Sequence, residues 1–148
     1  LLVFITDVHA MGLETAQGLL VTSAFYWDRD DGTRAFAKAF AAKNNGKMPT
    51  MVQAGVYASV LDYLKAVDAT KGKDSKAVLD WMKANPTDDP LFGKGSILAN
   101  GRVLHDMYLY QVKSPAESKG AWDYFKLVDT IPAKDAFQTV EQSGCTLG

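Results

Sequence analysis

The segment from residue 50 to about 69 constrains the fold more than any other part of the chain. Thr50 and Gln53 form a T-x-x-Q capping box, in which two side chains pair with backbone amides at the start of a helix. Apolar side chains then recur at helical spacing and form one broad stripe: Val52, Val56, Val60, Leu61, Tyr63, Leu64 and Val67. A helix of this kind is expected to pack its stripe against a sheet or another helix.

The remaining elements alternate between strands and helices. Apolar and β-branched runs predict strands over 1–6, 19–22, 96–98, 102–113 and 122–131. Helical spacing and caps predict helices over 33–43, 75–85 and 132–138, with residues 87–95 as a loop. Asn100-Gly101 is typical of a tight hairpin turn. This order predicts an α/β fold with a mixed sheet.

Composition excludes several classes of protein. The chain has 148 residues, of which 47% are hydrophobic, so it is expected to form a packed core rather than a disordered chain. Its net charge of −1 provides no broad basic face, so no nucleic-acid partner is expected. No stretch approaches the roughly 18 apolar residues of a membrane helix. Cys145 is the only cysteine, so a free thiol or a partner outside the chain is expected.

The first residues of the chain show no start signal. Leu1 begins directly in an apolar run, without an initiator Met and without the basic stretch of a secretory signal. We therefore expect the chain to be cut from a longer precursor. The alternative is a domain that starts with an edge strand.

Asp7 and His9 follow the first predicted strand directly. Loops at the carboxyl ends of strands line the ligand crevice in open α/β sheets, so this pair is a candidate for binding a polar ligand or for acid–base chemistry. The alternative is a helix cap beside a surface histidine.

Other polar motifs give little support for catalysis or for metal binding. His105 and Asp106 are adjacent in a predicted strand and would point to opposite faces. Two histidines and one cysteine without H-x-x-x-H or C-x-x-C spacing predict no transition-metal site. Gly93-Lys94-Gly95 lacks the spacing of a phosphate-binding loop, so no nucleotide cofactor is expected.

An aromatic run, Phe25-Tyr26-Trp27, precedes an acidic break. Aromatic rings with a polar tip suit the wall of a small-molecule cleft. The alternatives are core packing for Phe25 and a lid over the following helix for Trp27. Tyr57, on the long helix, fits a core position at least as well as a ligand wall.

Five stretches, taken in order, resemble the C-terminal half of a known family. They are residues 4–14 (FITDVHAMGLE), 18–22 (GLLVT), 25–28 (FYWD), 48–60 (MPTMVQAGVYASV) and 105–115 (HDMYLYQVKSP). Together they are similar to the type I periplasmic solute-binding proteins of ABC importers, of the branched-chain amino-acid (Leu/Ile/Val-binding-like) family. The resemblance covers nearly the whole chain.

The resemblance implies a bilobal fold of which this chain is a part. Members have two three-layer α/β/α lobes joined by a three-strand hinge, and they close on a ligand between the lobes. Residues 1–48 would belong to the second lobe and residues 49–114 to the first. Residues 115–148 would return to the hinge and the second lobe, with hinge crossings at 47–49 and 114–115. The first half of the protein would be absent.

The resemblance also implies a site and a function. The residues expected to face the ligand are Asp7, Val8, His9, Tyr26, Trp27, Tyr57 and Phe92. Asp7 would be the carboxylate that holds an α-ammonium group. The expected function is reversible binding of an amino acid or a small aromatic or organic acid in the periplasm, with delivery to ABC permease subunits in the membrane. No catalytic residue, metal or cofactor is implied.

Two other functions remain open. A ligand-sensing receptor domain of the same fold would use the same cleft. A small α/β enzyme would use Asp7 and His9 as acid and base.

Overall fold

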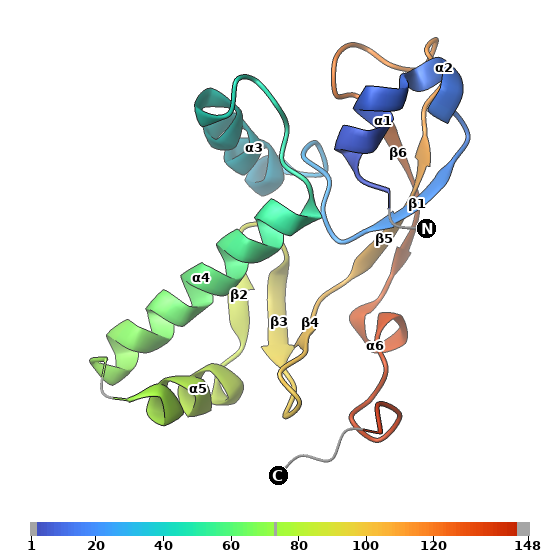
Figure 1. Cartoon of the computed structure of the whole chain (residues 1–148). Coiled ribbons are helices and arrows are strands. Elements are labelled where there is room, and N and C mark those ends of the chain that lie inside the picture. The colour runs from blue at the N-terminus through green and yellow to red at the C-terminus, as the bar shows by residue number, and fades with distance from the viewer. Residues whose placement is uncertain (1–2, 73, 145–148) are drawn as a thin grey trace.

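The computed structural model describes residues 3–72 and 74–144 (Figure 1). Its helices are α1 (Ile5–Met11), α2 (Leu13–Ala16), α3 (Asp31–Lys43), α4 (Met51–Thr70), α5 (Ser75–Ala84) and α6 (Ala133–Ala136). Its strands are β1 (Leu20–Ser23), β2 (Thr87–Asp89), β3 (Gly93–Ile97), β4 (Val103–Leu104), β5 (Met107–Val112) and β6 (Phe125–Ile131). Cys145 lies outside the described residues.

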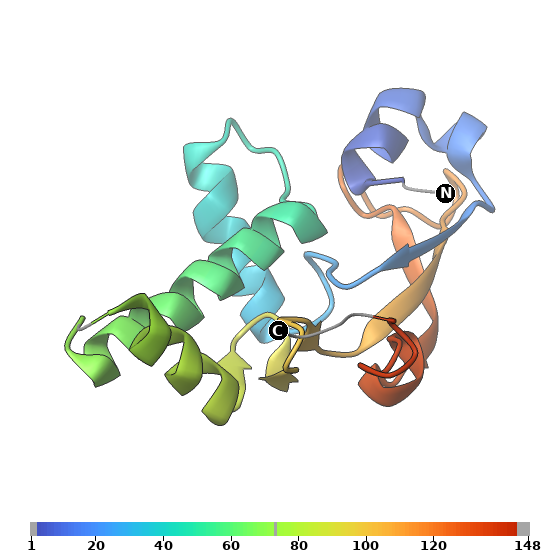
Figure 2. The same ribbon diagram turned by 60° about the horizontal axis from the view of Figure 1, so that its bottom comes forward.

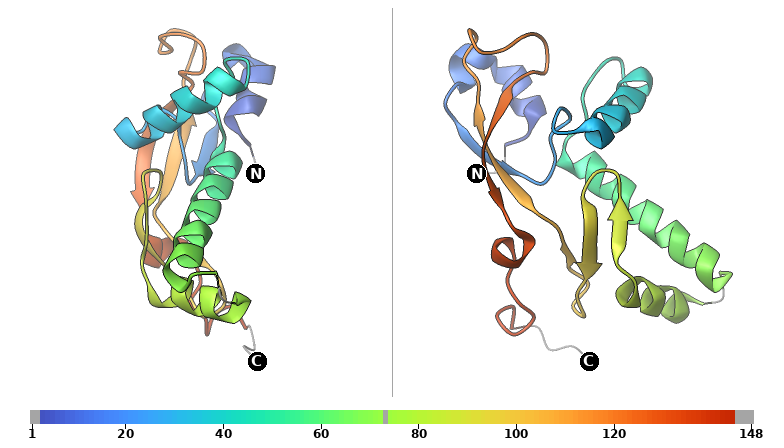
Figure 3. Two further views of the ribbon diagram at one scale, coloured as in Figure 1. Left: turned by 90° about the vertical axis from the view of Figure 1, so that its left-hand side faces the viewer. Right: turned by 180° about the vertical axis from the view of Figure 1, so that it is seen from behind.

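The elements gather into two parts. The α1 part contains α1, α2, β1, β5 and β6, and the α4 part contains α3, α4, α5, β2, β3 and β4. Figure 1 and Figure 3 show the two parts side by side, joined by the segment between β1 and α3 and by the β4–β5 connection. Helix α3 lies against α4, where the rings of Phe36 and Tyr57 are 5.0 Å apart between centroids (Figure 2).

Each part has its own three-stranded sheet. The α1 part has the order β1-β5-β6, and the α4 part has the order β2-β3-β4. All the strand pairs among the described residues are antiparallel, so the predicted mixed sheet is not found there. The central strand β5 pairs Tyr110 with Val21 on one side and with Leu127 on the other, beside an irregularity at Leu109/Tyr110. Tyr110 is therefore fixed in the core of the α1 part, with 1% of its surface exposed.

Two core clusters match the two parts. The first is built from buried apolar side chains of α1, α2, the sheet, the segment after β1 and the loop before β6: Ile5, Val8, Ala16, Val21, Tyr26, Tyr110, Val112, Trp122, Tyr124 and Phe125. The second contains Phe25, Ala54 and Leu91. Trp27 packs against both clusters, so it links the interiors of the two parts.

The predicted strand over residues 1–6 is wrong for its second half. Residues 5 and 6 begin helix α1, and residues 3 and 4 precede it outside any strand, while residues 1–2 lie outside the described residues. The backbone N–H of Phe4 donates to the Asp7 carboxylate at 2.7 Å, which caps the helix start. Ile5 and Val8 are both buried and lie three positions apart, a spacing that places them on one helical face. Short apolar runs do not by themselves separate strand from helix.

The predicted strand over 102–113 is two strands with a break. His105 and Asp106 lie between β4 and β5, not within a strand, so the opposite-face argument does not apply to them. Asp106 accepts a hydrogen bond from the backbone N–H of Ala133 at 2.9 Å, which ties the break to the start of α6. The predicted loop over 87–95 also contains β2 and the start of β3.

The capping box of α4 is confirmed. Gln53 Oε1 accepts from the Thr50 backbone N–H at 2.9 Å, and Thr50 Oγ1 accepts from the Val52 N–H at 3.1 Å. Most of the apolar stripe is nevertheless uncovered, because Val56 is 60% exposed and Val52, Val60, Tyr63 and Leu64 are each more than half exposed, whereas Leu61 and Val67 are partly buried. None of the helices in the described part of the chain is long and apolar enough to cross a membrane.

Close packing at Gly32 predicts a large effect of one methyl group. A Cβ atom there would lie 2.2 Å from the Pro90 carbonyl oxygen, where α3 meets the turn between β2 and β3. We expect Gly32→Ala to lower the free energy of unfolding by about 1–3 kcal/mol, although alanine favours helix. Urea denaturation measures the change.

The matched control is Gly55→Ala in helix α4, where nothing lies within 4 Å of the added atom. This control should leave stability unchanged or raise it by up to about 1 kcal/mol. Equal effects of the two substitutions would contradict the close approach of α3 to Pro90.

Candidate functional site

An aromatic cluster occupies the α1 part where it faces the junction between the two parts. Trp27 Nε1 donates to the backbone carbonyl of Trp122 at 2.8 Å, and the Tyr26 hydroxyl donates to the same oxygen at 3.3 Å. The Tyr26 ring is 5.9 Å from the ring of Trp27. Two aromatic side chains that follow β1 are thus held by one carbonyl from the loop before β6.

His9 joins this cluster from helix α1. Its ring stacks on the ring of Trp122, with centroids 4.1 Å apart and planes 12° apart. His9 Nδ1 also lies within hydrogen-bond distance of the Tyr124 hydroxyl, at 2.7 Å. His9 is exposed, whereas Trp122 and Tyr124 are each 8% exposed, so the imidazole covers a buried aromatic pair.

The loop at residues 113–124 holds Trp122 in a strained backbone conformation. Its φ of +69° is left-handed, a region that bulky residues rarely adopt. Lys113 and Asp123 form an ion pair with little solvent exposure on either side. The Lys119 backbone N–H also donates to Asp123 at 2.8 Å. These contacts fix the loop on both sides of Trp122 and aim its carbonyl at Trp27.

The ionisation of Asp123 contributes to this loop. Burial alone would raise the pKa of Asp123, but hydrogen bonds from Lys113 and the Lys119 N–H, with the charges of both lysines, outweigh it. The pKa of Asp123 is therefore held below its usual value. A carboxylate of this kind stabilises the fold while it is ionised.

The seven residues expected to face the ligand do not form one group in the described chain. His9, Tyr26 and Trp27 come together, and Val8 supports them from the core with no exposed surface. Tyr26 is also buried, with 6% of its surface exposed, so it can support the site by packing but offers little surface to a ligand. Tyr57 and Phe92 lie in the α4 part, where Tyr57 is 40% exposed.

Asp7 and His9 do not form an acid–base pair. Both belong to α1 rather than to a strand-end loop, and two positions on a helix are roughly 200° apart. The Asp7 carboxylate accepts from the Phe4 N–H, and His9 contacts Tyr124. This geometry does not favour the enzyme in which the two residues act together.

Trp122 and Tyr124 are site residues that the sequence did not indicate. They lie beyond residue 115, where the recognised stretches end, in a segment whose loose alternation predicted a strand. The signal in the sequence that could have indicated them is the W-D-Y spacing, which places two aromatic rings on one side of the chain.

Arg29, in the segment between β1 and α3, contacts both parts at their junction. Its guanidinium donates to the Leu91 carbonyl at 2.5 Å and to the Asp30 carboxylate at 2.9 Å. It also lies over the ring of Tyr108 in β5, 4.7 Å from the centroid. One side chain therefore connects the segment after β1, the β2–β3 turn and the central strand of the other part.

Each part contains a cavity of its own. One of about 480 Å³ lies between α1, α2 and the loop at residues 113–124, and it includes His9, Glu14, Ser118 and Tyr124 in its lining. The other, of about 310 Å³, lies between α4, α5 and the β2-β3-β4 sheet. Phe92 lines the second cavity, so the expected ligand residues reach two separate spaces.

The Lys113–Asp123 pair predicts how stability depends on pH. We expect Asp123→Asn to lower the free energy of unfolding at pH 7 by about 1–3 kcal/mol, because Lys113 loses its charged partner. The contribution of Asp123 is present above its unfolded pKa of about 3.9 and is lost as the pH falls through its lower folded pKa. Urea denaturation between pH 3 and 7 measures both effects.

The matched control for this pair is Asp129→Asn, at an exposed position on β6. The Asp123 variant should show a shallower loss of stability in acid than the wild type or the control. An identical acid profile for all three proteins would contradict the role assigned to the ion pair.

Comparison with solved structures places this geometry among known proteins. A periplasmic binding protein from Burkholderia mallei is 49% identical, with a TM-score of 0.91, over 95% of this chain and 37% of its own. A branched-chain amino-acid ABC transporter periplasmic ligand-binding protein from Burkholderia xenovorans is 44% identical, with a TM-score of 0.89, over 95% of this chain and 37% of its own. A solute-binding protein from Rhodopseudomonas palustris, in complex with p-hydroxybenzoic acid, is 25% identical, with a TM-score of 0.70, over 88% of this chain and 35% of its own.

The chain therefore spans little more than a third of the length of these structures. No curated protein matches it significantly. The family model described as periplasmic binding protein matches residues 1–121. The fold and this match agree with the resemblance found in the sequence, and the chain belongs to the periplasmic binding protein family.

Proposed function

We propose that this chain is part of the solute-binding component of an ABC importer. It would bind an amino acid or a small aromatic or organic acid reversibly, without chemical change, in the periplasm and deliver it to a membrane permease. The observation that carries the proposal is the position of Trp27, whose partly exposed ring packs against the cores of both parts. A ring at such a junction can change its contacts when two lobes close on a solute.

We assign the two parts to the two lobes of the family. The resemblance implied that residues 1–48 and 115–148 belong to one lobe and residues 49–114 to the other. Helix α3 lies against α4, however, which favours moving the first crossing to the segment between β1 and α3. The pairing of β5 with β1 favours moving the second crossing toward residues 105–106, between β4 and β5. The Arg29 contacts then lie at the hinge.

A first half of the protein, outside this chain, would complete both lobes. The uncovered apolar stripe of α4 and the 60% exposed side chain of Leu20 on β1 support this proposal. Strand β1 also lies at the edge of its sheet, with β5 on one side only. Apolar faces and sheet edges of this kind are covered in stable proteins.

The ligand chemistry follows from the accessible members of the site. Closure of the lobes would bring together aromatic walls from both parts, Trp27 and His9 from one and Tyr57 and Phe92 from the other, with Val8 and Tyr26 as buried supports. Asp7 would hold an ammonium group where the ligand has one. The names of two similar structures indicate a branched-chain amino-acid transporter and a p-hydroxybenzoic acid complex, so leucine and p-hydroxybenzoate are the probes of choice.

Isothermal titration of the full-length protein with leucine and with p-hydroxybenzoate tests the function. We expect saturable 1:1 binding of one of these two solutes, recovered unchanged after binding. Absence of binding to both solutes would contradict the ligand class. Conversion of either solute into a product would contradict binding without chemistry.

Substitution of Trp27 tests the site. Trp27→Phe keeps an aromatic ring but removes the Nε1 donor that binds the Trp122 carbonyl. We expect roughly tenfold weaker solute binding, which corresponds to about 1.4 kcal/mol. The same titration measures the change.

Trp81→Phe, in helix α5, is the matched control and should leave affinity unchanged. Equal solute affinities for the Trp27 variant and the wild type would contradict the role of Trp27 in the binding site.

A further inference from the structure

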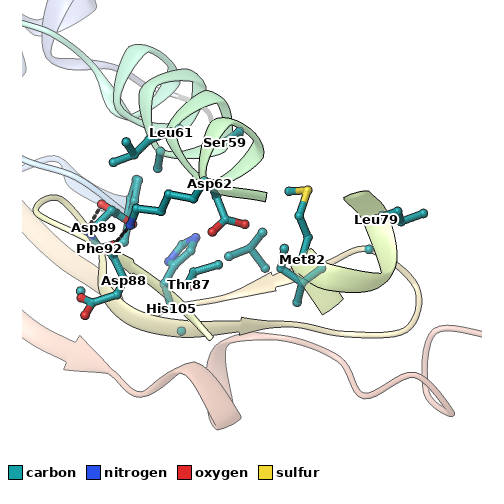
Figure 4. Close-up of a pocket in the computed structure, with 18 residues that line it drawn as sticks. Ser59, Leu61, Asp62, Leu79, Met82, Thr87, Asp88, Asp89, Phe92 and His105 are labelled. Atoms are coloured by element: carbon teal, nitrogen blue, oxygen red, sulfur yellow. Dashed lines mark hydrogen bonds between the residues drawn. The ribbon is translucent and has the colours of Figure 1, made fainter. Parts of the chain in front are cut away.

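The cavity between α4, α5 and the β2-β3-β4 sheet is mostly apolar (Figure 4). Its volume is about 310 Å³. The apolar lining comes from all three sides and includes Ala58, Leu61, Leu79, Met82, Ile97 and Val103. A space of this size holds one or two side chains.

One buried carboxylate projects into this apolar space. Asp62 on α4 is 9% exposed, and its Oδ2 atom is inaccessible to solvent and has no hydrogen-bond partner among the described residues. Figure 4 shows the carboxyl group pointing from α4 toward Thr87 and His105. Leaving a charged oxygen buried without a partner is costly, so its lack of a partner needs an explanation.

The charged neighbours of Asp62 do not provide the missing partner. Lys65, one turn along α4, donates its Nζ to the Asp88 carbonyl at 2.5 Å. Asp88 and Asp89 add negative charge from β2. The Nδ1 atom of His105 is 2.9 Å from the Asp106 carbonyl oxygen. Helix α5 contributes Leu79 and Met82 to the lining and no charged side chain.

The balance of charge around the cavity is therefore negative. Three carboxylates and one lysine line it, beside the imidazole of His105. Burial raises the pKa of Asp62, the charge of Lys65 opposes this, and the charge of Asp89 adds to it. A positively charged group entering the cavity would meet the carboxyl group of Asp62, whose Oδ2 atom lacks a partner, and a favourable field.

We propose that a lysine or arginine side chain from the part of the polypeptide outside these 148 residues enters this cavity and pairs with Asp62. The length of the similar structures supports the proposal, because this chain spans 37% of the first two of them. The proposal rests on the existence of that further chain, but it does not depend on which solute the protein binds. A buried apolar side chain, a water molecule or a free cation are the other occupants that the experiment separates.

Thermal unfolding of the full-length protein tests the pairing. The variants are Asp62→Asn and Asp62→Leu, with Asp68→Asn as control on the same helix, where the Asp68 side chain is 87% exposed. At pH 7 we expect both Asp62 variants to unfold about 5 °C or more below the wild type, and the control to match it. Because a paired carboxylate has a lowered pKa, the advantage of the wild type should persist down to about pH 4 and shrink as the pH falls below the unfolded pKa of about 3.9.

The opposite results would overturn the proposal. An Asp62→Leu protein as stable as the wild type would indicate an apolar occupant. A wild type that gains stability over Asp62→Asn as the pH falls toward 5 would indicate a carboxyl group still unpaired, with water alone or nothing beside it. Loss of the wild-type advantage after dialysis into buffer free of added salts and metal ions would indicate a free cation.

A second measurement needs no variant. The ¹³C chemical shift of the Asp62 carboxyl group, followed by NMR against pH in the full-length wild type, gives its pKa directly. We expect titration below the ordinary value of about 3.9, and titration above it would contradict pairing. Both measurements report stability or ionisation rather than solute binding. They therefore test the pairing of Asp62 even if the protein binds neither leucine nor p-hydroxybenzoate.

Discussion

The carbonyl of Trp122 is the contact on which the arrangement of the site depends. It accepts hydrogen bonds from Trp27 and from Tyr26, and its own residue supports the ring of His9. The left-handed backbone at Trp122 places this carbonyl, and the Lys113–Asp123 pair holds the loop that contains it. A segment after β1, a helix near the start of the chain and a loop after β5 thus meet at one residue.

Local signals predicted much of the fold. The T-x-x-Q box fixed the start of α4, and Asn100-Gly101 marked the turn between β3 and β4, where Leu98 N–H donates to the Arg102 carbonyl at 2.8 Å. The start of helix α1 was predicted as strand because its apolar, β-branched residues fit either element, and the Asp7 side chain that caps it bonds backward along the chain to Phe4. The recognised family stretches gave the architecture that periodicity alone left open.

The site was less predictable because its contacts join residues far apart in sequence. Trp27 meets a carbonyl 95 positions away, and Arg29 donates to a carbonyl 62 positions away. Nothing in a local window shows such pairs. The sequence shows the stripe on α4 only as a helical pattern, without its exposure to solvent. It shows Asp62 only as one acidic residue, without the burial of its Oδ2 atom or the lack of a hydrogen-bond partner there. Their exposure and burial become meaningful once the length of similar proteins is known.

The proposed site places a small solute against Trp27 at the junction of two lobes. A crystal structure of the full-length protein, purified without denaturation so that it keeps any solute acquired during expression, tests it most directly. We expect density for a small molecule in contact with the Trp27 ring and between the two lobes. Density for a solute bound elsewhere, with Trp27 covered only by protein, would contradict it.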